Sequence, residues 1–142
     1  MLELATVLVV LHVTANMVWI GTISAVAGIL VAPSATTDRG QQKGLLALHL
    51  YKRWATPAFT VSFVLGVARL SLDLHGYFVR THFMHGKLLF AFAVIGLHHV
   101  IGARAKKYAR APETSLASVL PLLGALIACA AVAVYFAVFK PF

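Results

Sequence analysis

Four long apolar runs, separated by short polar connectors, take up most of this 142-residue chain. Hydrophobic residues make up 61% of the sequence, charged residues make up only 11%, and the mean hydropathy is +0.88. A soluble domain could not cover that much apolar surface with so few charges. Because a membrane-crossing helix needs about 20 predominantly apolar residues, the sequence predicts an integral membrane protein.

The apolar runs predict an all-α fold, an integral membrane four-helix bundle with short loops that forms a single domain over residues 1–142. The expected spans are residues 4–32, 55–72, 83–103 and 115–139. Pro33 ends the first span, Pro57 is tolerated in the first turn of the second, and Pro121 either kinks the fourth or marks its start. Residues 41–54 are expected to form a helix at the level of the lipid headgroups.

Basic residues are concentrated in the connectors after the first and third spans. They are Arg39, Lys43, Lys52 and Arg53 in the first connector, and Arg104, Lys106, Lys107 and Arg110 in the second. The positive-inside rule therefore places loops 33–54 and 104–114 in the cytoplasm and both termini outside, in the cell inner (plasma) membrane. The net charge of +8 is then mainly an orientation signal, and without a binding motif it does not predict a nucleic-acid partner.

The sequence lacks the residues that several classes of protein chemistry require. The single cysteine, Cys129, excludes a disulfide or a thiolate metal cluster within one chain. The predicted spans contain no Asp or Glu, so a hydrolase based on paired carboxylates is excluded as well. The first apolar run lacks the basic start of a signal peptide and is interpreted as a permanent helix.

The first span carries two polar residues on one face. His12 lies roughly 12 Å from its outer end, and Asn16 follows one turn later. Polar groups at this depth in a membrane are costly, so they are retained for a site more often than for the fold. These residues therefore predict a polar stripe that faces another helix.

The third span carries four basic or imidazole side chains, which divide between two faces. Lys87 and His98 are eleven positions apart, which places them within about 20° of each other around the helix. His85 and His99 lie within about 40° of each other on a nearly opposite side. One pair is expected to face the bundle, and the other to face a different helix, a partner or lipid headgroups.

Structural explanations stay open for several of these side chains. Lys87 and Arg69 lie near the outer ends of their spans, so either could extend to the membrane interface. His98 or His99 could contact phosphate groups at the cytoplasmic interface.

Imidazoles held by rigid helices suit axial ligation of haem iron, and neighbouring basic residues could pair with the propionates. The candidate metal ligands are His12, His85, His98 and His99. Copper is an open alternative because imidazole also binds copper, although Met1, Met17 and Met84 form no thioether cluster.

Several motifs in this order resemble the HemJ-type protoporphyrinogen IX oxidases over most of the chain. They are Leu11-His12 with Trp19-Ile-Gly21, Leu50-Tyr-Lys-Arg-Trp-Ala-Thr-Pro57 with Leu65-Gly66, and His85-Gly-Lys87-Leu-Leu with Leu97-His98-His99. The third motif is the most specific, whereas the first is shared with CopD-like copper-resistance membrane proteins. The chain departs from the HemJ family over residues 23–35, which contain no Arg and no His.

The resemblance implies a b-type haem and the oxidation of protoporphyrinogen IX to protoporphyrin IX, with a membrane quinone as electron acceptor. It implies that His12 is an axial ligand or redox-site residue and that Lys87 binds a propionate or assists proton removal. The candidate cofactor-binding residues are His12, Asn16, Arg69, His85, Lys87, His98 and His99. The alternatives are a CopD-like copper-handling protein and a non-catalytic membrane subunit, and a homo-oligomer is plausible because four short helices enclose little volume.

Overall fold

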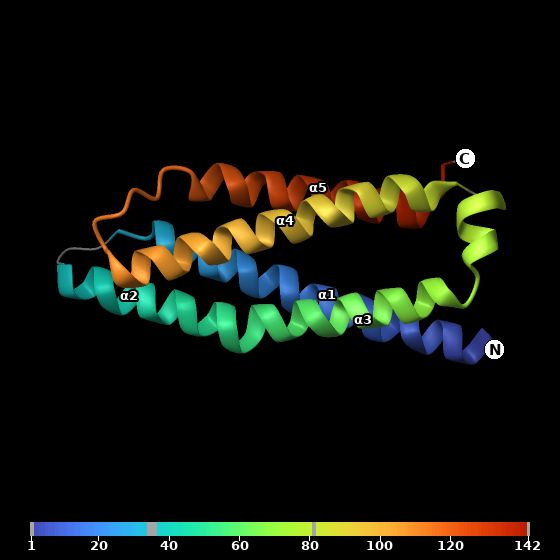
Figure 1. The fold of residues 1–142 in the computed structure, drawn as a ribbon, viewed down its shortest axis with the longest axis horizontal. Helices are drawn as coiled ribbons and strands as arrows, with labels where there is room; N and C mark the ends of the chain where they lie inside the picture. Colours follow the sequence, from blue (N-terminus) through green and yellow to red (C-terminus); the bar gives the residue numbers. More distant parts are fainter. Residues whose placement is uncertain (1, 34–36, 81, 142) are drawn as a thin grey trace.

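A computed structural model describes residues 2–33, 37–80 and 82–141 (Figure 1). Over these ranges the chain is helical and contains no strand, which confirms the all-α prediction. The elements are α1 (Leu2–Val31), α2 (Thr37–Leu50), η1 (Tyr51–Ala55), α3 (Thr56–Ser71), η2 (Gly76–Arg80), α4 (Phe83–Arg110) and α5 (Val119–Phe139).

Three of the helices, α1, α4 and α5, are long and apolar enough to cross a membrane. Large apolar side chains also point outward, among them Met17, Leu89 and Phe139, which suits contact with lipid. The second predicted span corresponds to α3, which has 16 residues and a length of about 24 Å. This is shorter than the hydrocarbon core, which is about 30 Å thick.

The helix ends follow the prolines more closely than the edges of the apolar runs. α1 ends at Val31, two residues before Pro33, as predicted. α4 continues past the predicted residue 103 to Arg110 because alanine, lysine and arginine favour helix. It stops where Pro112 forces Ala111 into an extended conformation, with φ −139° and ψ 86°. α5 begins at Val119 rather than at residue 115, which places Pro121 in its first turn.

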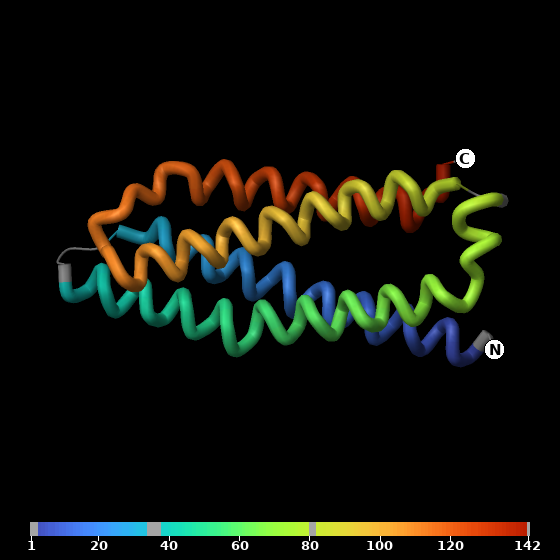
Figure 2. Tube along the Cα trace, viewed as in Figure 1, coloured from blue at the N-terminus to red at the C-terminus, as the bar shows by residue number. Residues whose placement is uncertain are grey.

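Residues 37–71 form one continuous helical rod, which Figure 2 traces from α2 through η1 into α3. The predicted helix over 41–54 is therefore present and begins four residues earlier. Within the rod, η1 is a widened π-helical turn in which the Thr56 N–H donates to the Tyr51 carbonyl. Pro57 follows immediately and has no N–H for the carbonyl four residues back, so a wider turn accommodates it.

The helices associate mainly in pairs, α1 with α3 and α4 with α5, while α2 packs against α4 and α1. Figure 1 shows that the start of α1, the end of α5 and η2 lie at the same end of the molecule. We call this end the terminal half: residues 2–17 of α1, most of α3, η2 and residues 83–93 of α4. The connector half contains the rest of α1, residues 37–55 and residues 94–110 of α4.

The buried hydrophobic core lies mostly in the connector half. Its members are Trp19, Ile23, Val26, Ala27, Leu30, Ala47, Ala55, Val94, Ile101, Ala105, Tyr108, Val119 and Leu126. Two glycines permit this packing. A Cβ on Gly44 would lie 2.8 Å from the Ala109 Cα, and a Cβ on Gly102 would overlap the Tyr51 ring. Small residues at these points therefore let α2 and η1 approach α4 closely.

Candidate functional site

His12 is part of a closed ring of hydrogen bonds between α1 and α3. Its Nδ1 lies 2.8 Å from the Ser62 carbonyl oxygen, which can only accept, so Nδ1 carries the proton. Its Nε2 then accepts from the Asn16 side-chain amide at 3.0 Å. The Ser62 hydroxyl closes the ring by donating to the Asn16 Oδ1 at 2.7 Å. Each polar group in the ring has a partner, so the cost of burying these groups in lipid is reduced.

Gly66 makes room for the His12 imidazole. It lies one turn after Ser62 on α3, and a Cβ there would be 3.0 Å from the His12 Cε1. The polar stripe predicted from His12 and Asn16 therefore faces α3. Sequence reasoning did not include Ser62, because a single serine in an apolar run is unremarkable until its face of α3 is known.

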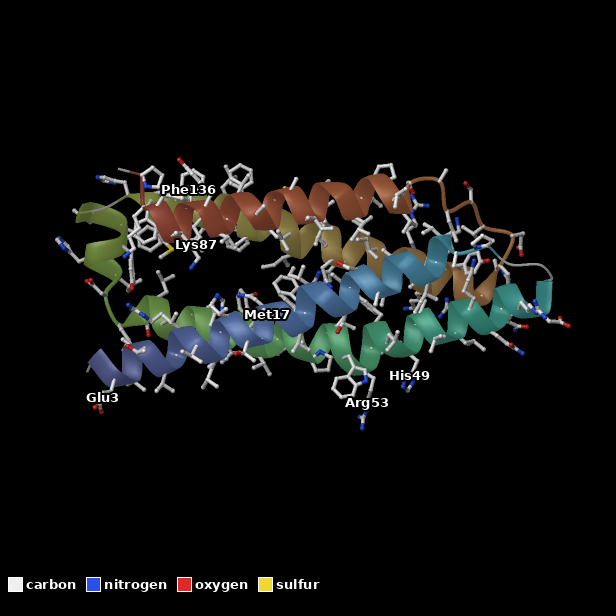
Figure 3. All side chains as sticks on the ribbon, turned by 180° about the vertical axis from the view of Figure 1, so that it is seen from behind. Glu3, Met17, His49, Arg53, Lys87 and Phe136 are labelled. Carbon is white, nitrogen blue, oxygen red and sulfur yellow. The ribbon has the colours of Figure 1, made fainter. Side chains whose placement is uncertain are left out.

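Lys87 projects from α4 toward α1 and α3, as Figure 3 shows. Lys87 lies within electrostatic range of both His12 and Arg69. Arg69 lies on α3 with its guanidinium 5.2 Å from the Tyr77 ring centroid. Its buried Nε has no hydrogen-bond partner in the part of the chain that the structure describes. In the described ranges neither Arg69 nor Lys87 forms an ion pair, so two cations face the interior of the terminal half without a carboxylate.

His98 is fully buried in the connector half. The Trp19 indole N–H donates to its Nδ1 at 3.1 Å, and since that N–H can only donate, the neutral ring carries its proton on Nε2. That Nε2–H has no partner among the residues described. An unsatisfied buried donor of this kind costs about 1–3 kcal/mol. In this tautomer neither ring nitrogen of His98 offers a free lone pair to a metal.

His85 and His99 are exposed, and each bonds within its own segment. The His99 Nδ1 donates to the Ile95 carbonyl at 2.8 Å, and the His85 Nδ1 donates to the His82 carbonyl at 3.0 Å. The predicted division of α4 is therefore present, since His98 is buried and Lys87 projects toward α1 and α3, while the other two histidines are exposed.

The four histidines predicted as metal ligands do not converge. Over residues 2–33, 37–80 and 82–141, no group of three or more His, Cys, Asp or Glu side chains could hold a metal ion. His85 and His99 lie on the outer face of α4. In His98, Nδ1 accepts from the Trp19 indole and Nε2 carries the proton. Of these four histidines, His12 combines an interior position with an Nε2 lone pair, and that lone pair accepts from the Asn16 amide.

We compared the chain with known protein families, curated proteins and solved structures. No family model, no curated protein and no solved structure matches the chain.

Proposed function

We propose that the chain is a four-span membrane protein that binds haem b and oxidises protoporphyrinogen IX, the activity implied by its resemblance to the HemJ-type oxidases. One observation supports this most strongly. The cations Arg69 and Lys87 face the bundle interior beside His12 without a carboxylate among the described residues. Such a cationic pair in an apolar bundle suits an anionic, lipophilic ligand, and a tetrapyrrole with two propionates has this chemistry.

The residues in the terminal half fit haem held through one imidazole. A histidine that ligates a metal usually donates its other N–H to a carbonyl or carboxylate, and His12 donates its Nδ1–H to the Ser62 carbonyl. His12 would hold the haem iron through Nε2, and Asn16 would release that atom. Arg69 and Lys87 would pair with propionates. When bound, haem supplies an iron centre that accepts and passes on single electrons.

Lys87 is proposed to act on the substrate directly. Its ammonium can pair with a propionate, and after losing its proton the same amine can accept a proton from the tetrapyrrole. The overall reaction removes six electrons and six protons from protoporphyrinogen IX. Three quinone molecules, each taking two electrons and two protons, balance it.

In this proposal α1, α4 and α5 cross the inner (plasma) membrane, and η1 and α3 together form the remaining crossing, the second in chain order. Figure 3 shows His49 and Arg53 projecting away from the bundle near the start of that crossing. An arginine such as Arg53 at this level suits the cytoplasmic face, with residues 33–54 and 104–114 on that side and both termini outside.

The absorption spectrum of protein purified from a haem-sufficient host tests the cofactor. We expect a Soret band that is lost in His12→Ala and retained in His99→Ala, a matched control on an exposed imidazole. A wild-type protein without the band, or an undiminished band in His12→Ala, would overturn haem ligation by His12. Metal analysis of the same sample tests the alternative, because copper without haem would favour a CopD-like role.

A further inference from the structure

The His98 imidazole, whose Nε2–H has no partner among the described residues, packs within a cluster of rings that includes the His99 imidazole. The ring centroid of His98 lies 5.1 Å from Tyr51, 5.3 Å from Phe59 and 5.6 Å from Trp19. A water molecule needs two to four polar partners to be held in a protein interior. No described residue accepts from this Nε2–H, so the position suits a flat ligand that carries one strong acceptor.

The aromatic cluster around His98 reaches the outer surface of the bundle. Phe59 on α3 is half-buried, and its ring centroid lies 5.3 Å from His98 and 5.6 Å from the exposed His99, while the two imidazole centroids lie 5.0 Å apart. The helices that carry these residues, α3 and α4, make almost no backbone contact with each other. Rotation of the Phe59 side chain would therefore open a path between α3 and α4 from the lipid to the His98 Nε2.

We propose that His98, Tyr51 and Phe59 form a binding site for a planar, lipid-soluble carbonyl compound of the quinone class. The His98 Nε2–H donates to one carbonyl oxygen of the ligand, whose ring lies against the Tyr51 and Phe59 faces. Trp19 acts as a positioning residue, because its N–H fixes the tautomer that makes Nε2 a donor. The site rests on the proposed function only for the choice of quinone as the ligand class, and it is separate from His12.

Tryptophan fluorescence provides the assay, because quinones quench an indole at short range. The chain has two tryptophans, Trp19 beside His98 and Trp54, which is 57% exposed. A Trp54→Phe background leaves Trp19 as the only reporter. The protein as purified, in lipid nanodiscs, is titrated with 2-methyl-1,4-naphthoquinone. We expect saturable quenching in addition to the linear quenching caused by partition into the lipid.

Two comparisons assign the binding to the Nε2 donor. His98→Leu should weaken the saturable phase by about tenfold, the loss expected for one buried hydrogen bond, whereas His99→Leu should leave it unchanged. 2-Methylnaphthalene, which has the same flat body but no carbonyl, should compete at least about tenfold more weakly in the unmodified protein. This second comparison decides the question even if His98→Leu does not fold.

Quenching without saturation, or equal competition by 2-methylnaphthalene, would overturn the proposal. An equal loss in His98→Leu and His99→Leu would do the same. The Soret band of the same samples is recorded independently. Loss of haem with retained quinone binding therefore counts only against the proposed function, and the reverse result counts only against this site.

Discussion

The two halves of the bundle bury histidine in opposite ways. In the terminal half, His12 is part-buried and both of its ring nitrogens have partners, while the charged groups near it have no counter-ion among the described residues. In the connector half, His98 is fully buried among aromatic and aliphatic side chains, and one of its nitrogens has no partner. The comparison sets packing against interior charge, since the connector half holds most of the buried core and the terminal half holds the interior cations Arg69 and Lys87.

The electrostatics of the terminal half are unfavourable for folding alone. Two cations that face each other in a low-dielectric interior repel, and removing either charge from water is costly. The protein retains both Arg69 and Lys87 at this point. A bound anionic group would replace the repulsion between these two cations by attraction to the anion. For this reason we place the anionic ligand in the terminal half.

Substitution of Lys87 is expected to have the largest effect on function and to separate function from stability. Lys87→Gln should lower the rate of protoporphyrinogen oxidation by about 100-fold, the lower end of the effect of losing a proton-transfer group. Thermal stability of the ligand-free protein should not fall, because repulsion with Arg69 is removed. Porphyrin fluorescence and thermal unfolding in detergent measure the two quantities.

Lys106→Gln is the control for this prediction, because Lys106 is exposed on the same helix and far from His12. If Lys87→Gln unfolds at a markedly lower temperature while Lys106→Gln does not, Lys87 has a structural role and the separation between the two halves is wrong.

A glycine substitution in the connector half is expected to lower stability, whereas substitution of Lys87 is expected to lower activity. Gly102→Val would place a side chain in the volume of the Tyr51 ring and should destabilise the protein by about 2 kcal/mol. Gly96→Val on the same helix meets nothing within 4 Å and should be nearly neutral. Thermal unfolding of the two variants checks this, and equal melting temperatures would contradict the packing of η1 on α4.

The smallest expected effect concerns the hydrogen-bonded ring itself. Ser62→Ala removes the hydroxyl that binds Asn16 but retains the backbone carbonyl that binds His12. We expect a loss of about 0.5–1 kcal/mol in stability, typical of one hydrogen bond between membrane helices, and an unchanged Soret band.

Thr60→Ala is the matched control for Ser62→Ala, because its hydroxyl bonds only to the Thr56 carbonyl of its own helix. Loss of the Soret band in Ser62→Ala would show that the hydroxyl, and not the carbonyl, orients His12.

The sequence could predict those features that depend on local periodicity. The apolar runs located α1, α4 and α5, and the spacing of Lys87 and His98 predicted their common face. It could not predict contacts between distant segments. Trp19 and His98 are 79 positions apart, and the pairing of His12 with Ser62 depends on how α1 crosses α3. Pattern analysis measures orientation within one helix, whereas these contacts require the orientation of two helices at once.

The widened turn η1 sets the angle between the two faces that the rod from α2 to α3 presents to its neighbours. In α2, Gly44 faces α4, and in α3, Ser62 and Gly66 face α1. Loss of a single residue within Tyr51–Ala55 would swivel one part against the other by about 100°, the angle between successive residues of a helix. The number of residues in η1 is therefore fixed by packing, because a rod one residue shorter could not place α2 against α4 and α3 against α1 at the same time.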